Sequence, residues 1–307
     1  MIEKDVHVPM RDGTILRADV YRPDTDSPVP VVVARLPYDR SHSLIPSSAL
    51  DPDRAVEKGF AFVCQDSRGR YGSDGHFRPF VDEATDGFDT VEWAAAQPWS
   101  SGAVGMAGRS YGAGAQWLAA AEQPPHLRAM FPVVIGSDFY DGWIYQGGAF
   151  QLGFNVFWDL LISAPKEAPR AVAHSGHLPL NTLPVLRATG DRASFYFDWI
   201  AHSTNDAYWK AKAFNTRYGR VNVPACNVGG WYDVFLGGTL ENFARMRREG
   251  GSAAANHEGK APQVESRAAE YGGKRRAVIA TESPSDPSGC AEQEDFDEVA
   301  ASGFASM

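Results

Sequence analysis

The feature that most constrains the fold of this chain is the alternation of short apolar runs with helical patterns between residues 29 and 135. Residues 29–36 (VPVVVARL) form a continuous apolar run rich in β-branched side chains, which is typical of a strand buried on both faces. Further strands are predicted at 60–64, 103–107 and 129–135, with helices at 53–58, 83–97 and 111–122. This alternation indicates βαβ units and an α/β fold built on a mostly parallel sheet with helices on both faces.

The flanking segments differ in pattern, and they divide the chain into four parts. Residues 5–10 and 14–23 alternate polar and apolar side chains around a turn, which predicts antiparallel strands. Aromatic residues are dense from 137 to 217, and no clean buried strand occurs there, so we expect a helical cap over the sheet. A strand at 221–228 and a helix at 239–248 then resume the sheet pattern. The predicted parts are therefore a first core segment (1–136), a cap (137–217), a second core segment (218–250) and a tail (251–307).

The tail has a composition unlike the rest of the chain. Residues 251–307 are rich in Ala, Gly, Ser and acidic side chains, and the one apolar segment in them is 277–280. Such a segment lacks the apolar surface that would offset the entropy cost of ordering it, so we expect it to be disordered.

The segment Gly108-Arg109-Ser110-Tyr111-Gly112 matches the pattern G-x-S-x-G. A predicted strand leads into it and a predicted helix leads out, which is the context of a nucleophile elbow. The turn is tight enough that side chains at Gly108 and Gly112 would collide with neighbouring backbone, and Ser110 must adopt strained dihedral angles. A glycine-rich turn with a helix-capping serine is the alternative. Dinucleotide-binding and P-loop motifs do not match the segment.

Composition excludes several classes of partner. A formal net charge of −9 argues against binding to nucleic acid. The absence of a long apolar run and of an apolar stretch at the start predicts no membrane span and no signal peptide. Three scattered cysteines (Cys64, Cys226 and Cys290) suit neither a disulfide framework nor a metal site. We therefore expect a cytoplasmic protein with no metal and no cofactor.

Three segments in order resemble the cocaine-esterase and X-prolyl dipeptidyl-peptidase (CocE/NonD) family of serine hydrolases. These segments are DSRGRYGSDG at 66–75, EATDGFDTVEWAAAQPWSSGAVGMAGRSYGAGAQWLAA at 83–120 and GGWYDVF at 229–235. The resemblance covers about residues 2–250. It implies an α/β-hydrolase fold with a helical cap, and hydrolysis of small carboxylic esters or amides through an acyl-serine intermediate. Action as an acyl esterase or as an X-Pro dipeptidyl-peptidase stays open, and so does a homo-oligomer.

The resemblance also implies roles for four residues. Ser110 would be the nucleophile, and Asp233 would orient the catalytic histidine. The backbone N–H of Tyr111 and the hydroxyl of Tyr38 would donate hydrogen bonds to the oxyanion. Physical reasoning supports these roles, because Tyr38 and Asp233 both follow the carboxyl ends of predicted strands, where open α/β sheets carry their sites. One such donor contributes about 2.7–4 kcal/mol to the transition state.

The resemblance does not extend to a catalytic histidine. A serine nucleophile needs a base, and in this fold the base follows the acid along the chain. The one histidine after Asp233 is His257, which lacks the strand and turn of the family, and the jelly-roll domain of the family is also absent. We therefore expect a foreign ending beyond about Glu249, from a frameshift or a truncated gene. Two alternatives stay open: a catalytically impaired remnant of a hydrolase, and an acyltransferase on the same scaffold.

Overall fold

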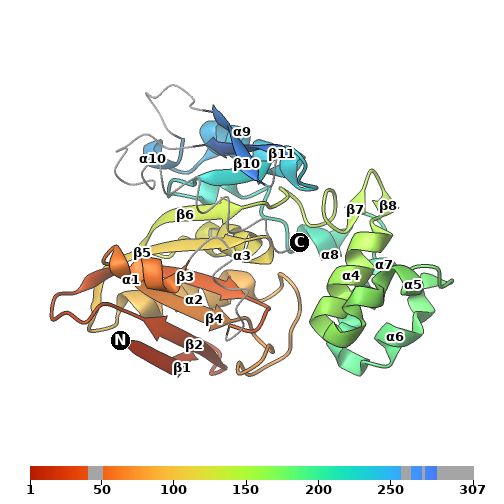
Figure 1. Cartoon of the computed structure of the whole chain (residues 1–307), viewed down its shortest axis with the longest axis horizontal. Coiled ribbons are helices and arrows are strands. Elements are labelled where there is room, and N and C mark those ends of the chain that lie inside the picture. The colour runs from red at the N-terminus through yellow and green to blue at the C-terminus, as the bar shows by residue number, and fades with distance from the viewer. Residues whose placement is uncertain (41–50, 257–263, 272–273, 282–307) are drawn as a thin grey trace.

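The computed structural model describes residues 1–40, 51–256, 264–271 and 274–281. Within these ranges, a nine-stranded sheet has the strand order β1-β2-β4-β3-β5-β6-β9-β11-β10 (Figure 1). Its strands are β1 (Ile2–Pro9), β2 (Ile15–Tyr21), β3 (Val29–Leu36), β4 (Ala61–Asp66), β5 (Ser100–Arg109), β6 (Leu127–Val133), β9 (Asn227–Gly230), β10 (Val264–Tyr271) and β11 (Lys274–Thr281).

The middle of the sheet is parallel. Strand β3 pairs in parallel with β4 and β5, β5 pairs with β6, and β6 pairs with β9. The antiparallel pairs lie toward the two edges, where β1, β2 and β4 form one set and β9, β11 and β10 the other. The prediction of a mostly parallel α/β sheet is confirmed.

Both faces of the central strands are buried, which explains their continuous apolar runs. On β4, Ala61 and Val63 belong to the main core, which also includes side chains of α2 (Glu83–Ala95) and α3 (Tyr111–Ala121). The alternate residues Phe62 and Cys64 form a second cluster with Ala55 of α1 (Pro52–Glu57). Because successive side chains of a strand point to opposite faces, α1 lies on one face of the sheet and α2 and α3 lie on the other.

Local signals set the ends of these helices. The Asp51 carboxylate caps α1 by accepting a hydrogen bond of 2.9 Å from the N–H of Asp53, and Pro52 occupies the first turn. Gly59 follows that helix with a φ of 84°, as its position after the helical pattern predicts. The second core segment ends in α9 (Leu236–Glu249), which Gly250 follows.

Strand β9 is shorter than the sequence predicts. The apolar run at 221–228 indicates a strand over its whole length, whereas the structure has β9 only at Asn227–Gly230. Before β9, Ala225 pairs with Met130 of β6 in one isolated parallel bridge. Pro224 has no N–H to donate to a neighbouring strand, so regular pairing begins only after it.

The cap combines helices with one small hairpin. Its helices are α4 (Leu152–Ser163), α5 (Ala171–His174), α6 (Pro184–Arg187), α7 (Ser194–Ala201) and α8 (Ala207–Lys210). They gather beside one end of the sheet, at the right of Figure 1. A hairpin of β7 (Tyr145–Gln146) and β8 (Ala149–Phe150) precedes them. The sequence predicts only helices in this insertion, so the hairpin is a difference from the prediction.

The tail is not wholly without structure, contrary to the expectation of disorder from residue 251. Helix α10 (Ala253–Asn256) follows α9, and strands β10 and β11 pair with each other and with β9. The open edge of β9 offers unpaired backbone N–H and C=O groups, and β11 satisfies them from Thr281 to Val278. The apolar segment 277–280 lies within β11.

Among the residues that the structure describes, no helix is both long and apolar enough to span a lipid bilayer.

Asp159 is a buried carboxyl group in the core of the cap. It lies on α4 beside an apolar cluster that includes Val156, Leu160 and Tyr196. Neither carboxyl oxygen has a hydrogen-bond partner among the described residues. Burial raises the pKa of Asp159 well above its ordinary value of 3.8. The native state therefore keeps this proton at pH values where the unfolded chain has lost it.

We expect the free energy of unfolding to fall as the pH rises, because the unfolded chain then binds fewer protons than the native protein. Relative to Asp159→Asn, the wild type should lose up to about 1.4 kcal/mol per pH unit once the pH rises above about 4, where the carboxyl group of the unfolded chain ionises. Urea unfolding at several pH values measures this difference. Asp191→Asn, at an exposed position of the same cap, is the matched control. Parallel pH profiles for the wild type and Asp159→Asn would contradict the prediction.

Candidate active site

Ser110 occupies a sharp turn between β5 and α3. Its backbone has a φ of 55° and a ψ of −118°, a conformation that residues with a side chain rarely adopt. The N–H of Ser110 donates a hydrogen bond of 2.8 Å to the carbonyl of Val133 on β6, which fixes the turn to the neighbouring strand. The side chain is partly exposed at the start of the helix. This is the geometry of a nucleophile elbow.

The two glycines of the motif allow this turn. A Cβ atom on Gly108 would lie 3.2 Å from the carbonyl carbon and oxygen of Gly112. A Cβ atom on Gly112 would lie 3.0 Å from the carbonyl oxygen of Arg35 on β3. Both contacts are tight, and their partners are backbone atoms that cannot move aside easily. The crowding expected from the sequence is therefore present.

The register of the parallel strands brings the other predicted residues to the same edge of the sheet. Arg109, the last residue of β5, pairs with Val133 of β6, and Val133 pairs with Val228 of β9. Asp233 follows the end of β9, and Tyr38 follows the end of β3, on the other side of β5. The charge of Arg109 acts electrostatically on both Tyr38 and Asp233. The edge that carries Ser110 thus also carries the two other side chains.

Tyr38 contacts the cap through its hydroxyl group. The indole N–H of Trp158, on α4, donates a hydrogen bond of 3.0 Å to the Tyr38 oxygen. Burial raises the pKa of Tyr38 above 10.0, although the charges of Arg109 and Arg70 act in the opposite direction. The phenol is therefore protonated at neutral pH. Since an indole N–H can only donate, it leaves the proton of Tyr38 available for another acceptor.

Asp233 is held by the backbone of the turn that follows β9. Its Oδ1 atom accepts a hydrogen bond of 2.6 Å from the N–H of Phe235. Burial raises the pKa of Asp233 above 3.8, while the Phe235 N–H and the charge of Arg109 lower it. The side chain is partly buried, and its second oxygen can accept a hydrogen bond from an imidazole ring.

Tyr111 lies directly after Ser110, and its side chain is anchored below the turn. Its hydroxyl donates a hydrogen bond of 2.9 Å to Glu83 and accepts one of 3.3 Å from the N–H of Phe80. Glu83 in turn accepts a hydrogen bond from Arg35, which is fully buried on β3. The backbone N–H of Tyr111 is in the first turn of α3, where amide groups have no partner within the helix.

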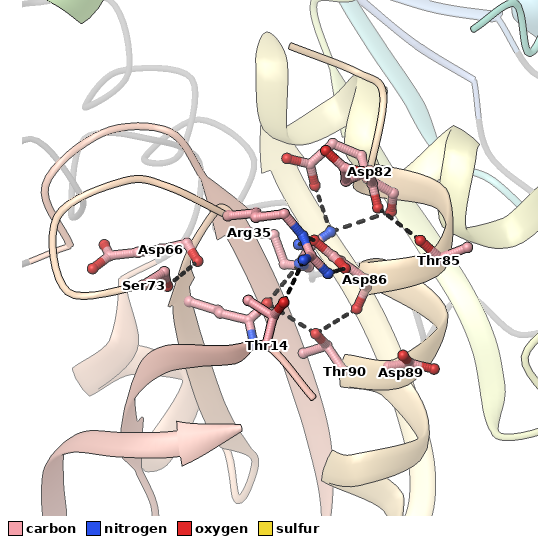
Figure 2. Close-up of polar contacts among 12 residues, drawn as sticks. Thr14, Arg35, Asp66, Ser73, Asp82, Thr85, Asp86, Asp89 and Thr90 are labelled. Carbon is pink, nitrogen blue, oxygen red and sulfur yellow. Dashed lines mark hydrogen bonds and ion pairs between the residues drawn. The ribbon is translucent and has the colours of Figure 1, made fainter. Parts of the chain in front are cut away.

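A buried polar network extends from Arg35 through α2 (Figure 2). Arg35 donates a hydrogen bond of 2.6 Å to Gln65 on β4, and the Thr90 hydroxyl donates one of 2.9 Å to the same oxygen. Arg35 also lies 3.7 Å from Asp86, which forms a second ion pair with Arg68. Arg68 and Asp86 are therefore ion-paired members of this network.

Sequence reasoning missed Arg35 and Glu83 as supports of the elbow. The signal was the charged Arg35 inside the apolar run at 29–36, because an arginine buried on both sides of a sheet requires a carboxylate partner.

Aromatic side chains of the cap pack against Tyr111 and Phe235, which lie next to the predicted site residues. The ring of Trp158 stacks on Tyr111 at 6.1 Å and on Trp199 at 5.8 Å. Phe235, two residues after Asp233, packs against Trp143 at 4.9 Å. The site therefore has apolar surroundings in which hydrogen bonds to a developing charge are strong.

Among the described residues, no histidine forms a hydrogen bond or ion pair with Ser110 or Asp233. His257, the one histidine that follows Asp233, lies outside them. No group of three or more His, Cys, Asp or Glu side chains within the described ranges could hold a metal ion.

Comparisons with known proteins agree with the geometry. The model of the X-Pro dipeptidyl-peptidase (S15) family matches residues 12–260. A cocaine esterase of Rhodococcus sp. (strain MB1 Bresler) is 34% identical over 269 residues, which cover 80% of this chain and 46% of that enzyme. This chain therefore spans about half the length of that relative.

Solved structures of similar proteins share the same core. A CocE/NonD family hydrolase from Staphylococcus aureus is 27% identical with a TM-score of 0.56, and the match covers 73% of this chain and 39% of that chain. An α-amino acid ester hydrolase is 26% identical with a TM-score of 0.63, and the match covers 80% of this chain and 45% of that chain. The expected α/β-hydrolase fold is confirmed.

The buried support of the elbow can be tested through stability. We expect Arg35→Met to lower the free energy of unfolding by about 3–5 kcal/mol, because the change leaves Glu83 buried without its cation. Arg78→Met removes a pair with Asp82 in which the two side chains are 59% and 22% exposed, and it should cost less than about 1 kcal/mol. Urea unfolding compares the two variants, and equal losses would refute the role given to the network.

Proposed function

Because this chain belongs to the X-Pro dipeptidyl-peptidase (S15) family, we propose that it hydrolyses small carboxylic esters or amides through an acyl intermediate on Ser110. The observation that carries this proposal is the strained turn, which presents the Ser110 hydroxyl at the start of α3 and at the same sheet edge as Tyr38 and Asp233. A serine in an ordinary helix cap has no reason to adopt a positive φ.

In the proposed reaction, the Ser110 oxygen attacks the carbonyl carbon of the substrate and a base takes the serine proton. The oxygen of the tetrahedral intermediate accepts hydrogen bonds from the Tyr111 N–H and the Tyr38 hydroxyl. The C–O or C–N bond to the leaving group then breaks as the leaving group takes a proton, and water releases the acyl group from Ser110. Asp233 holds and orients the base, for which His257 is the candidate in this sequence.

Two features support the assignment of Tyr38 as a donor. Its pKa is raised, so the hydroxyl keeps its proton at neutral pH. The bond from Trp158 occupies the oxygen and leaves that proton to point elsewhere. Electrostatic stabilisation of this kind is usually the largest single contribution to catalysis of acyl transfer.

The range of substrates is also part of the proposal. The aromatic side chains above the elbow, among them Trp158 and Phe235, favour an apolar or aryl group near the scissile bond. We also place the protein in the cytoplasm, because Cys64 and Cys226, the cysteines within the described residues, are both free thiols.

A fluorophosphonate probe tests the nucleophile directly. We expect the wild-type protein to form one covalent adduct that peptide mass spectrometry places on Ser110. Ser110→Ala should show no adduct, and Ser100→Ala, at the opposite end of β5, should be labelled like the wild type. A folded wild-type protein that forms no adduct on Ser110 would contradict the proposed function.

The same assay tests the base. Slower labelling of His257→Ala than of the wild type would assign the base to His257, whereas equal rates would exclude it.

A further inference from the structure

One tryptophan of the cap contacts both residues that would stabilise the oxyanion. Trp158 lies on α4, and its indole N–H donates a hydrogen bond of 3.0 Å to the Tyr38 hydroxyl oxygen. The same ring stacks on that of Tyr111 at 6.1 Å, with an angle of 12° between the two planes. The proposed reaction gives Trp158 no step of its own, yet this side chain joins two donors that come from different elements of the core.

The Trp158 ring is itself held on several sides. Its side chain is buried in the main core. Trp199 of α7 stacks on it at 5.8 Å, and Phe195 of the same helix contacts it edge-on at 5.7 Å. Trp143 packs against it at 6.2 Å with the two planes nearly perpendicular. Close packing of this kind leaves a side chain few alternative rotamers, so the direction of the indole N–H is fixed.

The backbone that leads to Tyr38 is fixed by the core. The carbonyl of Leu36 accepts a hydrogen bond of 2.8 Å from the N–H of Ser67. The carbonyl of Pro37 accepts one of 2.7 Å from the Nε atom of Arg70. A phenol proton can still rotate about its C–O bond, and a donor that occupies the oxygen narrows the directions left for that proton. The bond from the indole therefore sets the remaining freedom of the hydroxyl.

Trp117 on α3 offers a matched comparison for this indole. It is fully buried, and its ring packs against Phe214 at 5.6 Å and against Tyr218 at 5.7 Å. Its indole N–H has no hydrogen-bond partner among the residues that the structure describes. Both tryptophans thus lie in aromatic surroundings, but of the two only Trp158 donates to a predicted site residue. The effect of losing an indole N–H can therefore be separated from that of losing aromatic packing.

We propose that Trp158 is a positioning residue, through which the cap directs the Tyr38 hydroxyl at the oxyanion. The inference rests on the proposed function, because that function assigns Tyr38 and the Tyr111 N–H as the oxyanion donors. The donor pair is then complete only while α4 is seated on the core, and a displaced cap leaves the Tyr38 hydroxyl free to turn away. If Trp158 only fills space, any loss caused by its replacement is independent of the Tyr38 hydroxyl.

The rate at which a fluorophosphonate labels Ser110 tests the proposal in the wild type, Trp158→Phe, Tyr38→Phe and the double variant. Phenylalanine keeps a ring against Tyr111 but cannot donate a hydrogen bond. We expect Trp158→Phe to lower the maximal labelling rate at least about tenfold, because a slightly misplaced group can cost about 100-fold. The probe concentration for half-maximal rate should change less than about twofold, since the lost interaction forms in the transition state.

The double variant distinguishes positioning from packing. Tyr38→Phe should lower the rate about 100-fold or more, as expected for the loss of one oxyanion donor. Adding Trp158→Phe to it should cost less than about twofold further, because the two groups act as one unit. Trp117→Phe, which removes an indole N–H that makes no bond, should be labelled within about twofold of the wild type.

The Tyr38→Phe variant also gives a second measurement that does not require Trp158→Phe to fold. Loss of the acceptor should move the proton NMR signal of the Trp158 indole N–H upfield and leave that of Trp117 in place. An unmoved Trp158 signal would overturn the inference.

Three labelling results would overturn it as well: a Trp158→Phe rate close to that of the wild type, an equal loss with and without the Tyr38 hydroxyl, or the same loss in Trp117→Phe. Each of them, in a wild-type protein that is labelled at Ser110, removes only the positioning role. A folded wild-type protein that is not labelled at Ser110 removes the proposed function, and the positioning role with it.

Discussion

The structure depends on one strained turn, in which Ser110 takes a positive φ between a buried strand and a buried helix. A residue held in such a conformation costs about 1–3 kcal/mol, so the surroundings must fix it. Gly108 and Gly112 allow neighbouring backbone segments to approach closely. The hydrogen bond from the Ser110 N–H to the Val133 carbonyl holds the turn against β6. Below the turn, the Tyr111 hydroxyl, Glu83 and Arg35 connect the first residue of α3 to β3. The elbow is therefore part of the core, and this is what keeps the serine hydroxyl in one position.

The parallel strands bring the other predicted site residues to the edge of the sheet that carries this turn. Since β3, β5 and β9 end at the same edge, the residues just beyond them lie together although they are distant in sequence. Tyr38 also links the sheet to the cap, because its oxygen accepts the Trp158 bond. The cap therefore helps to fix the orientation of the Tyr38 hydroxyl.

Much of the core could be predicted from the sequence. The strand at 29–36 and the helix that begins at residue 111 have the predicted bounds or nearly so, because burial on both faces leaves a strong pattern. The G-x-S-x-G pattern indicated Ser110, and the family resemblance implied the roles of Tyr111, Tyr38 and Asp233; these roles remain predictions. Partners that depend on tertiary packing could not be predicted, such as Glu83 for Arg35 or Trp158 for Tyr38. The pairing of β11 with β9 was also missed, since a free strand edge is a property of the assembled sheet and leaves no mark in local composition.

We propose above all that the turn at Ser110 directs an acyl oxygen toward two donors, the Tyr111 N–H at the start of α3 and the Tyr38 hydroxyl after β3. A crystal structure of the protein with a phosphonate bound to Ser110 tests it most directly. We expect a phosphonyl oxygen about 2.7–3.1 Å from both the Tyr111 nitrogen and the Tyr38 hydroxyl oxygen, with Ser110 still at a positive φ. A phosphonyl oxygen that points away from both donors, or a Ser110 backbone that relaxes to a negative φ, would contradict it.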